Sequence, residues 1–224
     1  ERSDTGDAEG AIIERSAVPA LSPAQVSATL PALTGSHQQV PPMYSALKRA
    51  GQPLYRLARR GIVVERAARS VQIERLQLLE YGADELQLEV VCSAGTYVRV
   101  LGEDIARALG TCGRLTSLRR LYVEPFQDEV MVELAALRAL SAAAAPWPLL
   151  RADRAVLHLP SLALSCEQAR SLARGQIVTT VPPTPTAVLW RLYDDEGRFL
   201  GLGDSDECGR LRSRRLFSAP LPVT

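Results

Sequence analysis

The sequence predicts an α+β protein with a largely antiparallel sheet, followed by a smaller β-rich module. Between residues 68 and 99 apolar residues recur with a period of two, as expected of an antiparallel hairpin. Helix start and stop signals flank this hairpin on both sides. After residue 150 a short helix precedes two or three short strands joined by turns rich in Asp and Gly. We therefore predict two domains, residues 1–150 and 151–224.

The first elements follow a polar, turn-rich loop. A short strand is predicted at residues 11–14. The next helix has Ser22 as its N-cap, Pro23 at the first helical position and Gln25 to complete a capping box. Pro31 should kink this helix or end it early.

A second helix and the hairpin fill the centre of the sequence. Pro53 can open the helix, and Gly61 lies just past its end. The hairpin turns at residues 81–85, which include Gly82 and Asp84. The apolar residues expected to face each other are Val71, Ile73 and Leu76 on one strand and Leu86, Leu88 and Val90 on the other.

A third helix follows the hairpin directly. Its buried stripe is predicted to be Leu101, Ile105, Ala108 and Leu109, with Glu103 and Arg107 as an exposed ion pair. Further along we predict a strand at residues 115–126, a helix at residues 131–145, and a helix with Ser165 and Gln168 as capping box and Gly175 as its stop.

Composition excludes some classes of protein. The 46% hydrophobic and 23% charged residues are typical of a folded globular protein, and the net charge of +1 does not by itself indicate a nucleic-acid partner. The four cysteines form no Cys-x-x-Cys pair, so we expect reduced thiols, no metal site and a cytoplasmic location. No apolar run is long enough to span a membrane. The polar start without Met indicates a chain that begins partway through a longer one.

Tyr97 and Arg99 are the first candidate site residues. If the backbone there is extended, both side chains point to the same face, where a ring can stack on a base beside a cation. The alternative is a packed Tyr97 with Arg99 paired to Glu103 or Asp104. The residues alone leave both open.

Basic residues gather at 56–70, 118–121 and 209–216. Each run is by itself typical of a solvated face, but tyrosines between them raise the chance of a surface that follows a phosphate backbone. In a strand Arg119 and Arg120 face opposite sides, so one of them should point inward or be paired. The interleaved tyrosines are Tyr44, Tyr55, Tyr97 and Tyr122.

The acidic stretch at residues 3–10 contains Asp4, Asp7 and Glu9. It lacks the closing Glu of a calcium loop, and a turn in which Asp side chains cap backbone amides is the favoured interpretation. No Gly-rich phosphate loop, Gly-x-Ser-x-Gly motif or His-containing triad is present, which disfavours a hydrolase.

Four segments together resemble the TruB-type tRNA pseudouridine-55 synthases of bacteria. They are "SDTGDAEG", "QVPPMYSALKRAGQPLYRLARRGI", "CSAGTYVRVLGEDIARALG" and "LTSLRRL", and they cover residues 2 to about 126. The closing "GQIV" and "GRFLGLGDSDECGRLRSRRLF" resemble the PUA-type RNA-binding domain of such enzymes. The resemblance implies a mixed, largely antiparallel sheet in the synthase domain and a small β-rich PUA-like domain after it.

The implied reaction is the isomerisation of one uridine in the T loop of tRNA, after the base is flipped into a pocket. An aspartate drives it, without cofactor or metal. The resemblance assigns Tyr97 to the flipped base, Arg99 to the catalytic carboxylate and Asp7 to the cleft. It implies substrate contacts for Leu118, Tyr44, Lys48 and Arg119. The basic clusters described above predict RNA-backbone contacts for Arg59, Arg60, Arg212, Arg214 and Arg215.

The sequence departs from the family pattern at one essential place. The Gly-x-x-Asp-Pro-x-Ala-x-Gly motif with the catalytic aspartate does not occur in residues 1–224, so we expect this chain alone to be inactive. The expected partner is the T arm of tRNA, bound by a monomer with no obligate protein partner and no membrane. The alternative function is a non-catalytic RNA-binding protein or tRNA chaperone.

Overall fold

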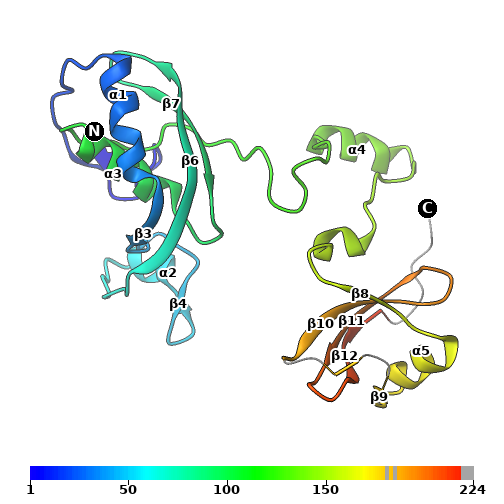
Figure 1. Cartoon of the computed structure of the whole chain (residues 1–224). Helices are drawn as coiled ribbons and strands as arrows, with labels where there is room; N and C mark the ends of the chain where they lie inside the picture. The colour runs from blue at the N-terminus through cyan, green and yellow to red at the C-terminus, as the bar shows by residue number, and fades with distance from the viewer. Residues whose placement is uncertain (180–181, 184–185, 218–224) are drawn as a thin grey trace. The chain divides into compact units, whose positions relative to one another are not determined.

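The structure is a computed structural model that describes residues 1–179, 182–183 and 186–217. The chain forms two compact units, Glu1–Arg119 and Arg120–Thr224 (Figure 1). Both combine helices with mainly antiparallel sheets, so the predicted α+β class is confirmed. The division between the units precedes residue 150, where the sequence predicts the domain boundary. In the predicted second domain, residues 180–181, 184–185 and 218–224 lie outside the described residues.

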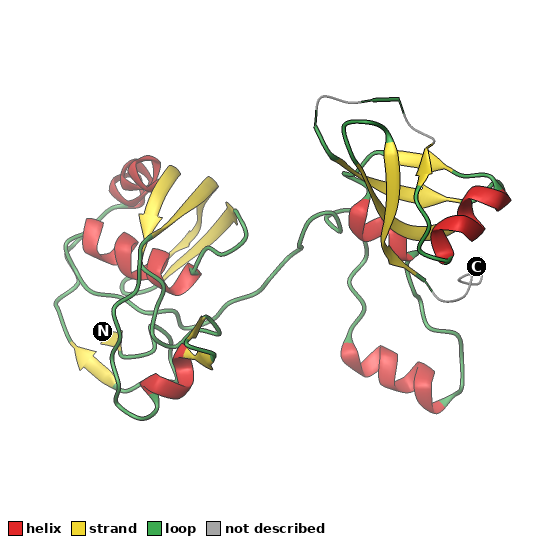
Figure 2. Cartoon of the chain, turned by 90° about the horizontal axis from the view of Figure 1, so that it is seen from below, coloured by secondary structure: helices red, strands yellow, loops and turns green. Residues whose placement is uncertain are grey.

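The first unit is built on a three-stranded antiparallel sheet in the order β3-β6-β7. Figures 1 and 2 show α1 and α3 on one face of this sheet. The core between them contains Leu30, Ile73, Leu101 and Ile105, all at most 5% exposed. The elements are β1 (Arg2–Ser3), β2 (Ile12–Glu14), α1 (Pro23–Thr29), β3 (Gly35–Gln39), β4 (Lys48–Arg49), β5 (Gln52–Pro53), α2 (Leu54–Ala58), β6 (Arg69–Tyr81), β7 (Leu86–Cys92) and α3 (Val98–Ala108).

Local signals in this unit act as the sequence predicts. The Ser22 hydroxyl accepts a hydrogen bond from the Gln25 N–H at 3.3 Å, and the Gln25 side chain accepts one from the Ser22 N–H at 2.8 Å. This capping box starts α1. The helix ends at Thr29 and continues as a 3₁₀ turn over Leu30–Leu33, which contains Pro31.

The second unit holds a five-stranded sheet in the order β8-β10-β11-β12-β9, in which β8 runs parallel to β10 and the other pairs are antiparallel. Leu164, Leu172, Leu192 and Leu211 form its core, and α5 lies against the sheet (Figure 2). The elements are α4 (Leu134–Ala142), a 3₁₀ helix (Ala152–Val156), β8 (Ser161–Ala163), α5 (Cys166–Ala173), β9 (Val178–Thr179), β10 (Val188–Tyr193), β11 (Phe199–Ser205) and β12 (Arg210–Leu216).

One predicted strand is wrong, and another is shorter than the alternating stretch of the sequence. Residues 115–126 form no strand, and within them only Leu115 makes a β-bridge, with Asp7. The second hairpin strand ends at Cys92 rather than continuing to Arg99, because a turn containing Gly95 at φ +85° leads straight into α3. The predicted pair of Glu103 with Arg107 is also wrong, because Arg107 pairs with Asp104.

None of the helices in the described part of the chain has the length and apolar character needed to cross a membrane.

Candidate active site

The loop between β1 and β2 holds Asp7 in a fixed orientation. One oxygen of its carboxylate, Oδ1, accepts hydrogen bonds from the Thr5 hydroxyl at 2.6 Å and from the Glu9 N–H at 3.2 Å. The Ser3 hydroxyl donates to the Asp7 carbonyl at 2.5 Å. The predicted turn, in which an Asp side chain caps a backbone amide, is confirmed at Asp7.

Gly6 lets helix α3 lie directly against this loop. It has φ +75°, a conformation that other residues rarely adopt. A Cβ atom at this position would stand 3.3 Å from Arg99 Cβ and 3.0 Å from a carboxylate oxygen of Glu103, so both neighbours would have to move by a few tenths of an ångström to accept a side chain. The Gly6 carbonyl also accepts a hydrogen bond from Leu115 N–H at 3.0 Å. The loop and the start of α3 are therefore closely packed.

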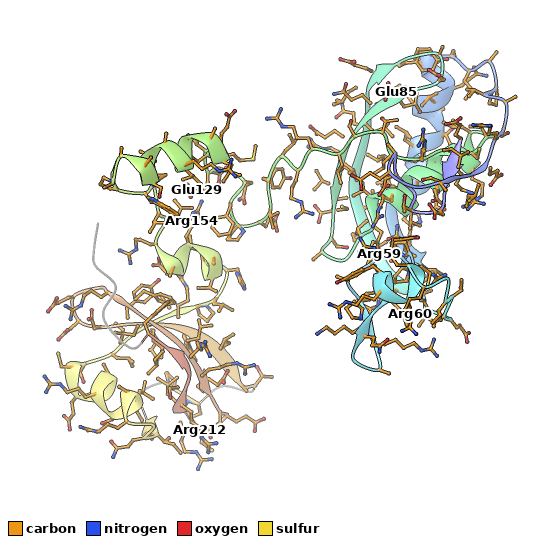
Figure 3. The ribbon with its side chains drawn as sticks, turned by 180° about the vertical axis from the view of Figure 1, so that it is seen from behind. Arg59, Arg60, Glu85, Glu129, Arg154 and Arg212 are labelled. Atoms are coloured by element: carbon orange, nitrogen blue, oxygen red, sulfur yellow. The ribbon has the colours of Figure 1, made fainter. Side chains whose placement is uncertain are left out.

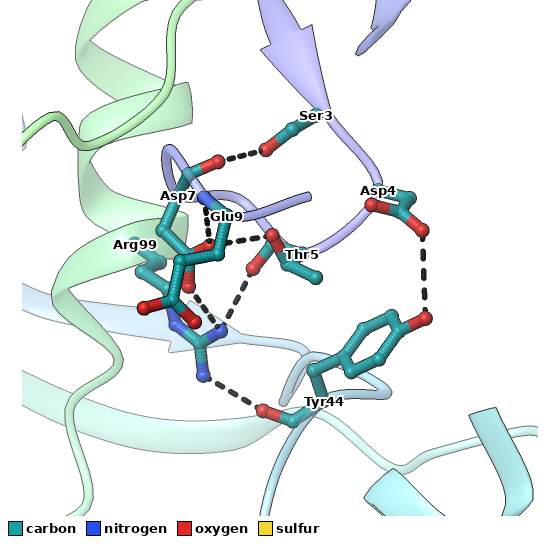
Figure 4. A network of polar contacts seen from close by, with 7 residues as sticks. All are labelled: Ser3, Asp4, Thr5, Asp7, Glu9, Tyr44 and Arg99. Carbon is teal, nitrogen blue, oxygen red and sulfur yellow. Dashed lines mark hydrogen bonds and ion pairs between the residues drawn. The ribbon is translucent and has the colours of Figure 1, made fainter. Parts of the chain in front are cut away.

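Arg99, the second residue of α3, links three segments that are far apart in the sequence (Figure 4). Its Nη1 donates to the Thr5 carbonyl at 2.8 Å and to Asp7 Oδ2 at 3.0 Å. Its Nη2 donates to the Tyr44 carbonyl at 2.7 Å. The guanidinium thus holds the loop of residues 3–10 and the segment after β3 against one helix start.

These groups line an open, polar hollow of about 370 Å³. Tyr44 closes one side, and its hydroxyl donates to Asp4 at 3.4 Å (Figure 4). Arg59 lines the hollow too, with its guanidinium 5.6 Å from the centre of the Tyr55 ring. The full lining consists of Asp4, Thr5, Asp7, Glu9, Gly10, Ala11, Tyr44, Arg59 and Arg99.

The surroundings of Asp7 keep its carboxylate charged. Burial by itself raises the pKa of Asp7, but this effect is outweighed. The hydrogen bonds from Thr5 and from the Glu9 amide, together with the charge and hydrogen bond of Arg99, bring the pKa below its ordinary value. The charged carboxylate of Asp7 forms an ion pair with Arg99 at 3.0 Å, and about seven-tenths of each side chain is buried.

The structure brings four of the predicted site residues together: Asp7, Tyr44, Arg59 and Arg99 all line the hollow. The alternative pairing of Arg99 with Glu103 or Asp104 is wrong, because Arg99 pairs with Asp7. Asp104 instead pairs with Arg107 at 2.6 Å.

The predicted extended arrangement of Tyr97 and Arg99 is wrong. Tyr97 is the N-cap of α3 and Arg99 lies inside the helix, where residues two apart are turned by about 200°. Tyr97 is half-buried and is not among the described residues that line the hollow.

The other predicted residues lie outside the hollow. Leu118 is 61% exposed. Arg119 and Arg120 are both exposed as well, so the expectation that one of these two arginines points inward is wrong. Lys48 is exposed on β4, and Arg60 lies next to Arg59 at the end of α2 (Figure 3).

The basic residues of β12 belong to the second unit. Arg212 and Arg215 are exposed (Figure 3 shows Arg212), while Arg214 pairs with Asp204 at 3.2 Å. Their contacts with RNA stay predictions.

Sequence reasoning missed two residues that shape this site, Thr5 and Gln39. Thr5 contributes both a hydroxyl to Asp7 and a carbonyl to Arg99. The two glycines that follow it, Gly6 and Gly10, are a local signal of a tight loop that could have indicated it. Gln39 acts across 58 residues, and no pattern in the sequence indicates its partner.

The chemistry of the hollow is that of a cation held beside a carboxylate. Arg99 uses three of its five N–H groups in the contacts described above, so two remain for a further acceptor. In the described part of the chain, no three His, Cys, Asp or Glu side chains are placed to hold a metal ion together. The arrangement suits a polar ligand that presents hydrogen-bond acceptors.

Solved structures with low sequence identity share the fold. The chain aligns with a protein in the crystal structure of a Cbf5-Nop10-Gar1 complex with a TM-score of 0.62 at 18% identity, over 89% of this chain and 63% of that one. A structure of an H/ACA RNP bound to a substrate RNA containing 2′-deoxyuridine gives a TM-score of 0.62 at 16% identity, over 90% of this chain and 63% of that one. This chain thus spans somewhat less than two thirds of those proteins.

Curated relatives are much closer in sequence. The tRNA pseudouridine synthase B of Chromohalobacter salexigens is 46% identical over 220 residues, which are 97% of this chain and 71% of the relative. The protein of the same name from Aromatoleum aromaticum is 48% identical over 216 residues, 96% of this chain and 69% of the relative.

Family models match almost the whole chain. Residues 1–98 match the TruB family pseudouridylate synthase N-terminal domain, and residues 99–152 match the tRNA pseudouridylate synthase B C-terminal domain. Residues 160–217 match the C-terminal region of pseudouridine synthase II TruB. With these matches and identities near 45%, the chain belongs to the TruB family of pseudouridine synthases.

Proposed function

We propose that this protein acts on tRNA, where it isomerises uridine 55 of the T loop to pseudouridine. Its relatives are named tRNA pseudouridine synthase B. The single observation that carries the proposal is the guanidinium of Arg99, held by Thr5, Asp7 and Tyr44 at the edge of an open polar hollow.

In the proposed reaction the bond between uracil N1 and the ribose C1′ breaks, and a bond between C5 and C1′ forms. The hydrogen on C5 leaves as a proton, and N1 gains one. The flipped base enters the hollow beside Tyr44, and unstacking it costs a few kcal/mol that contacts in the site must recover. Further substrate contacts, made outside the hollow, are assigned to Tyr97, Lys48, Leu118 and Arg119.

Asp7 is not the catalytic aspartate in this proposal. Both of its carboxylate oxygens are engaged, Oδ1 by Thr5 and Glu9 and Oδ2 by Arg99, and its pKa is lowered, so it is a poor nucleophile and a poor base. The aspartate required by the family reaction is supplied by protein outside residues 1–224. The two remaining N–H groups of Arg99 are suited to pair with that carboxylate.

The T arm is bound by basic side chains of both units. We assign phosphate contacts to Arg59 and Arg60 at the end of α2 and to Arg212, Arg214 and Arg215 on β12. In the described part of residues 151–224, the small five-stranded sheet with α5 and a 3₁₀ helix is suited to the PUA-like role. The protein acts as a monomer.

The test is the release of tritium from a T-arm stem–loop that carries [5-³H]uridine at position 55, because the C5 hydrogen is lost only if C5 bonds to the ribose. We expect the 224-residue chain to bind this RNA without releasing tritium, and a longer form that includes the aspartate motif to release it. The control RNA carries [5-³H]cytidine at position 55. If a longer form that binds the stem–loop releases no tritium from uridine 55, the proposed activity is wrong.

Residues 1–224 lack the aspartate motif, which favours a second candidate, a non-catalytic RNA-binding protein or tRNA chaperone. It predicts that binding of the stem–loop speeds the annealing of a misfolded tRNA without any release of tritium, whichever form of the protein is used.

A further inference from the structure

Gln39, the last residue of β3, is a buried polar side chain with an unusual pair of contacts. Only 6% of its surface is exposed. Its side-chain Nε2 donates to the Tyr97 carbonyl at 3.2 Å, and its Oε1 accepts from the Tyr97 N–H at 2.7 Å. Because a backbone N–H only donates and a carbonyl only accepts, these two bonds fix the orientation of the amide.

The residue that Gln39 clamps is the N-cap of α3. A helix start leaves N–H groups without partners, and α3 has neither a side-chain cap nor an acidic residue in its first turn. The Tyr97 carbonyl already accepts the first helical hydrogen bond, from Leu101 at 3.1 Å. The place where α3 begins is therefore set by an amide that comes from a strand 58 residues earlier.

Arg99 lies two residues past the clamp, and the segment that follows Gln39 reaches it a second time. Five residues after Gln39, the Tyr44 carbonyl accepts from Arg99 Nη2 at 2.7 Å. The same segment thus holds the backbone at the start of α3 and the tip of the arginine side chain. Gln39 itself is not among the described residues that line the hollow.

We propose that Gln39 is a positioning residue: by clamping the backbone N–H and carbonyl of Tyr97, it places the Arg99 guanidinium against Thr5 and Asp7. A shift of α3 by even about 1 Å would break contacts of 2.8 and 3.0 Å. This inference concerns the geometry of Arg99, and only its consequence for catalysis rests on the proposed function.

The test observes the guanidinium directly by NMR in the full chain. A guanidinium held by three acceptors rotates slowly about its Cζ–Nη bonds and gives separate Nη proton signals, which Arg99→Lys identifies by their loss. We compare Gln39→Met, which keeps the length of the side chain and removes both hydrogen bonds, with Gln38→Met, the matched change at the exposed neighbouring residue. The separate Arg99 signals should merge in the first variant and persist in the second.

Unchanged Arg99 signals in a folded Gln39→Met protein would overturn the proposal. If Gln39→Met fails to fold, hydrogen exchange in the unaltered chain decides. The Tyr97 N–H, which precedes the helix, should exchange at least about tenfold more slowly than the N–H groups of Val98 and Arg99, because only Gln39 protects it. Equal exchange of all three would overturn the clamp.

The consequence for catalysis has its own readout. In a form that releases tritium, Gln39→Met should lower kcat on the order of tenfold to a hundredfold with KM within about twofold, because Arg99 is misplaced while the phosphate contacts, which dominate RNA affinity, remain. A change confined to KM would count against positioning. If no form releases tritium but the Arg99 signals respond to Gln39→Met, the proposed activity fails and the positioning role stands.

Discussion

The ion pair between Asp7 and Arg99 can be tested by a double-mutant cycle. Arg99→Met keeps much of the apolar stem and removes the three hydrogen bonds that the guanidinium donates. At about 1 kcal/mol net for each hydrogen bond, the free energy of unfolding of the first unit should fall by about 2–3 kcal/mol. Asp7→Asn keeps the shape of the side chain and one acceptor oxygen for Thr5 and Glu9 but removes the acceptor for Arg99, and should cost about 1 kcal/mol.

The coupling between the two residues is the quantity of interest. Exposed ion pairs contribute about 0.2–1 kcal/mol. Because the side chains of Arg99 and Asp7 are only 26% and 31% exposed, we expect a value near the upper end, about 1 kcal/mol. The double variant should therefore lose about 1 kcal/mol less than the two single variants together.

Urea unfolding of the full chain separates the two units by their chromophores. Both tryptophans, Trp147 and Trp190, belong to the unit Arg120–Thr224, so their fluorescence follows that unit, while the far-UV circular dichroism follows both. The substitutions should shift the dichroism transition and leave the fluorescence transition in place. The exposed pair of Asp104 and Arg107 on the same helix is the matched control, with an expected coupling below about 0.5 kcal/mol. Single-variant losses that add to within about 0.3 kcal/mol would refute the coupling.

Three further predictions concern other charged groups. Burial raises the pKa of Glu103 despite nearby Arg2 and Arg107, so the folded state disfavours its charge. Glu103→Gln should therefore raise Tm at about pH 7, and this gain should vanish as the pH falls below 4.5. An equal gain in Tm at both pH values would contradict the raised pKa. Asp194 is 6% exposed and accepts hydrogen bonds from two backbone N–H groups and from the Arg198 side chain. Asp194→Ala should lower the free energy of unfolding of the second unit, followed by Trp fluorescence, by about 2–3 kcal/mol. An unchanged unfolding midpoint would disprove this prediction. Replacing Arg212 and Arg215 by Gln should reduce the slope of log K for T-arm binding against log salt by about one unit for each phosphate that these side chains neutralise; an unchanged slope would assign both to the solvated face.

The lowered pKa of Asp7 determines how the stability loss in Asp7→Asn depends on pH. Because the folded state lowers this pKa below 3.8, the charged form is stabilised by folding. The contribution is fully present above pH 3.8 and is lost as the pH falls through the lower folded value. The stability difference between the unaltered chain and Asp7→Asn should therefore shrink in acid, and a difference that grows below pH 3.8 would contradict the lowered pKa.

Elements that depend on neighbouring residues were predictable from the sequence. The capping boxes of Ser22 with Gln25 and of Ser165 with Gln168 both form, because each needs only residues three positions apart. The hairpin of β6 and β7 follows from alternating apolar residues on either side of a short turn.

The errors occur where local pattern and tertiary environment disagree. The apolar residues of 115–126 fit a strand, but in the described part of the chain no strand pairs with them, and only Leu115 finds a partner. Alternation also favours an extended Tyr97 and Arg99, but the helix that buries Leu101 and Ile105 begins earlier than expected and takes Arg99 with it.

Residue patterns alone are enough to predict the family, the class of fold, most helix starts and Asp7 and Arg99 as candidate site residues. The partners of Arg99 follow only from the folded chain. The three acceptors of Arg99 come from residues 94, 92 and 55 positions away, and the clamp from Gln39 acts across 58. Local signals extend over about one helical turn, whereas these contacts exist only because the core formed by Leu30, Ile73, Leu101 and Ile105 brings α3 against the sheet.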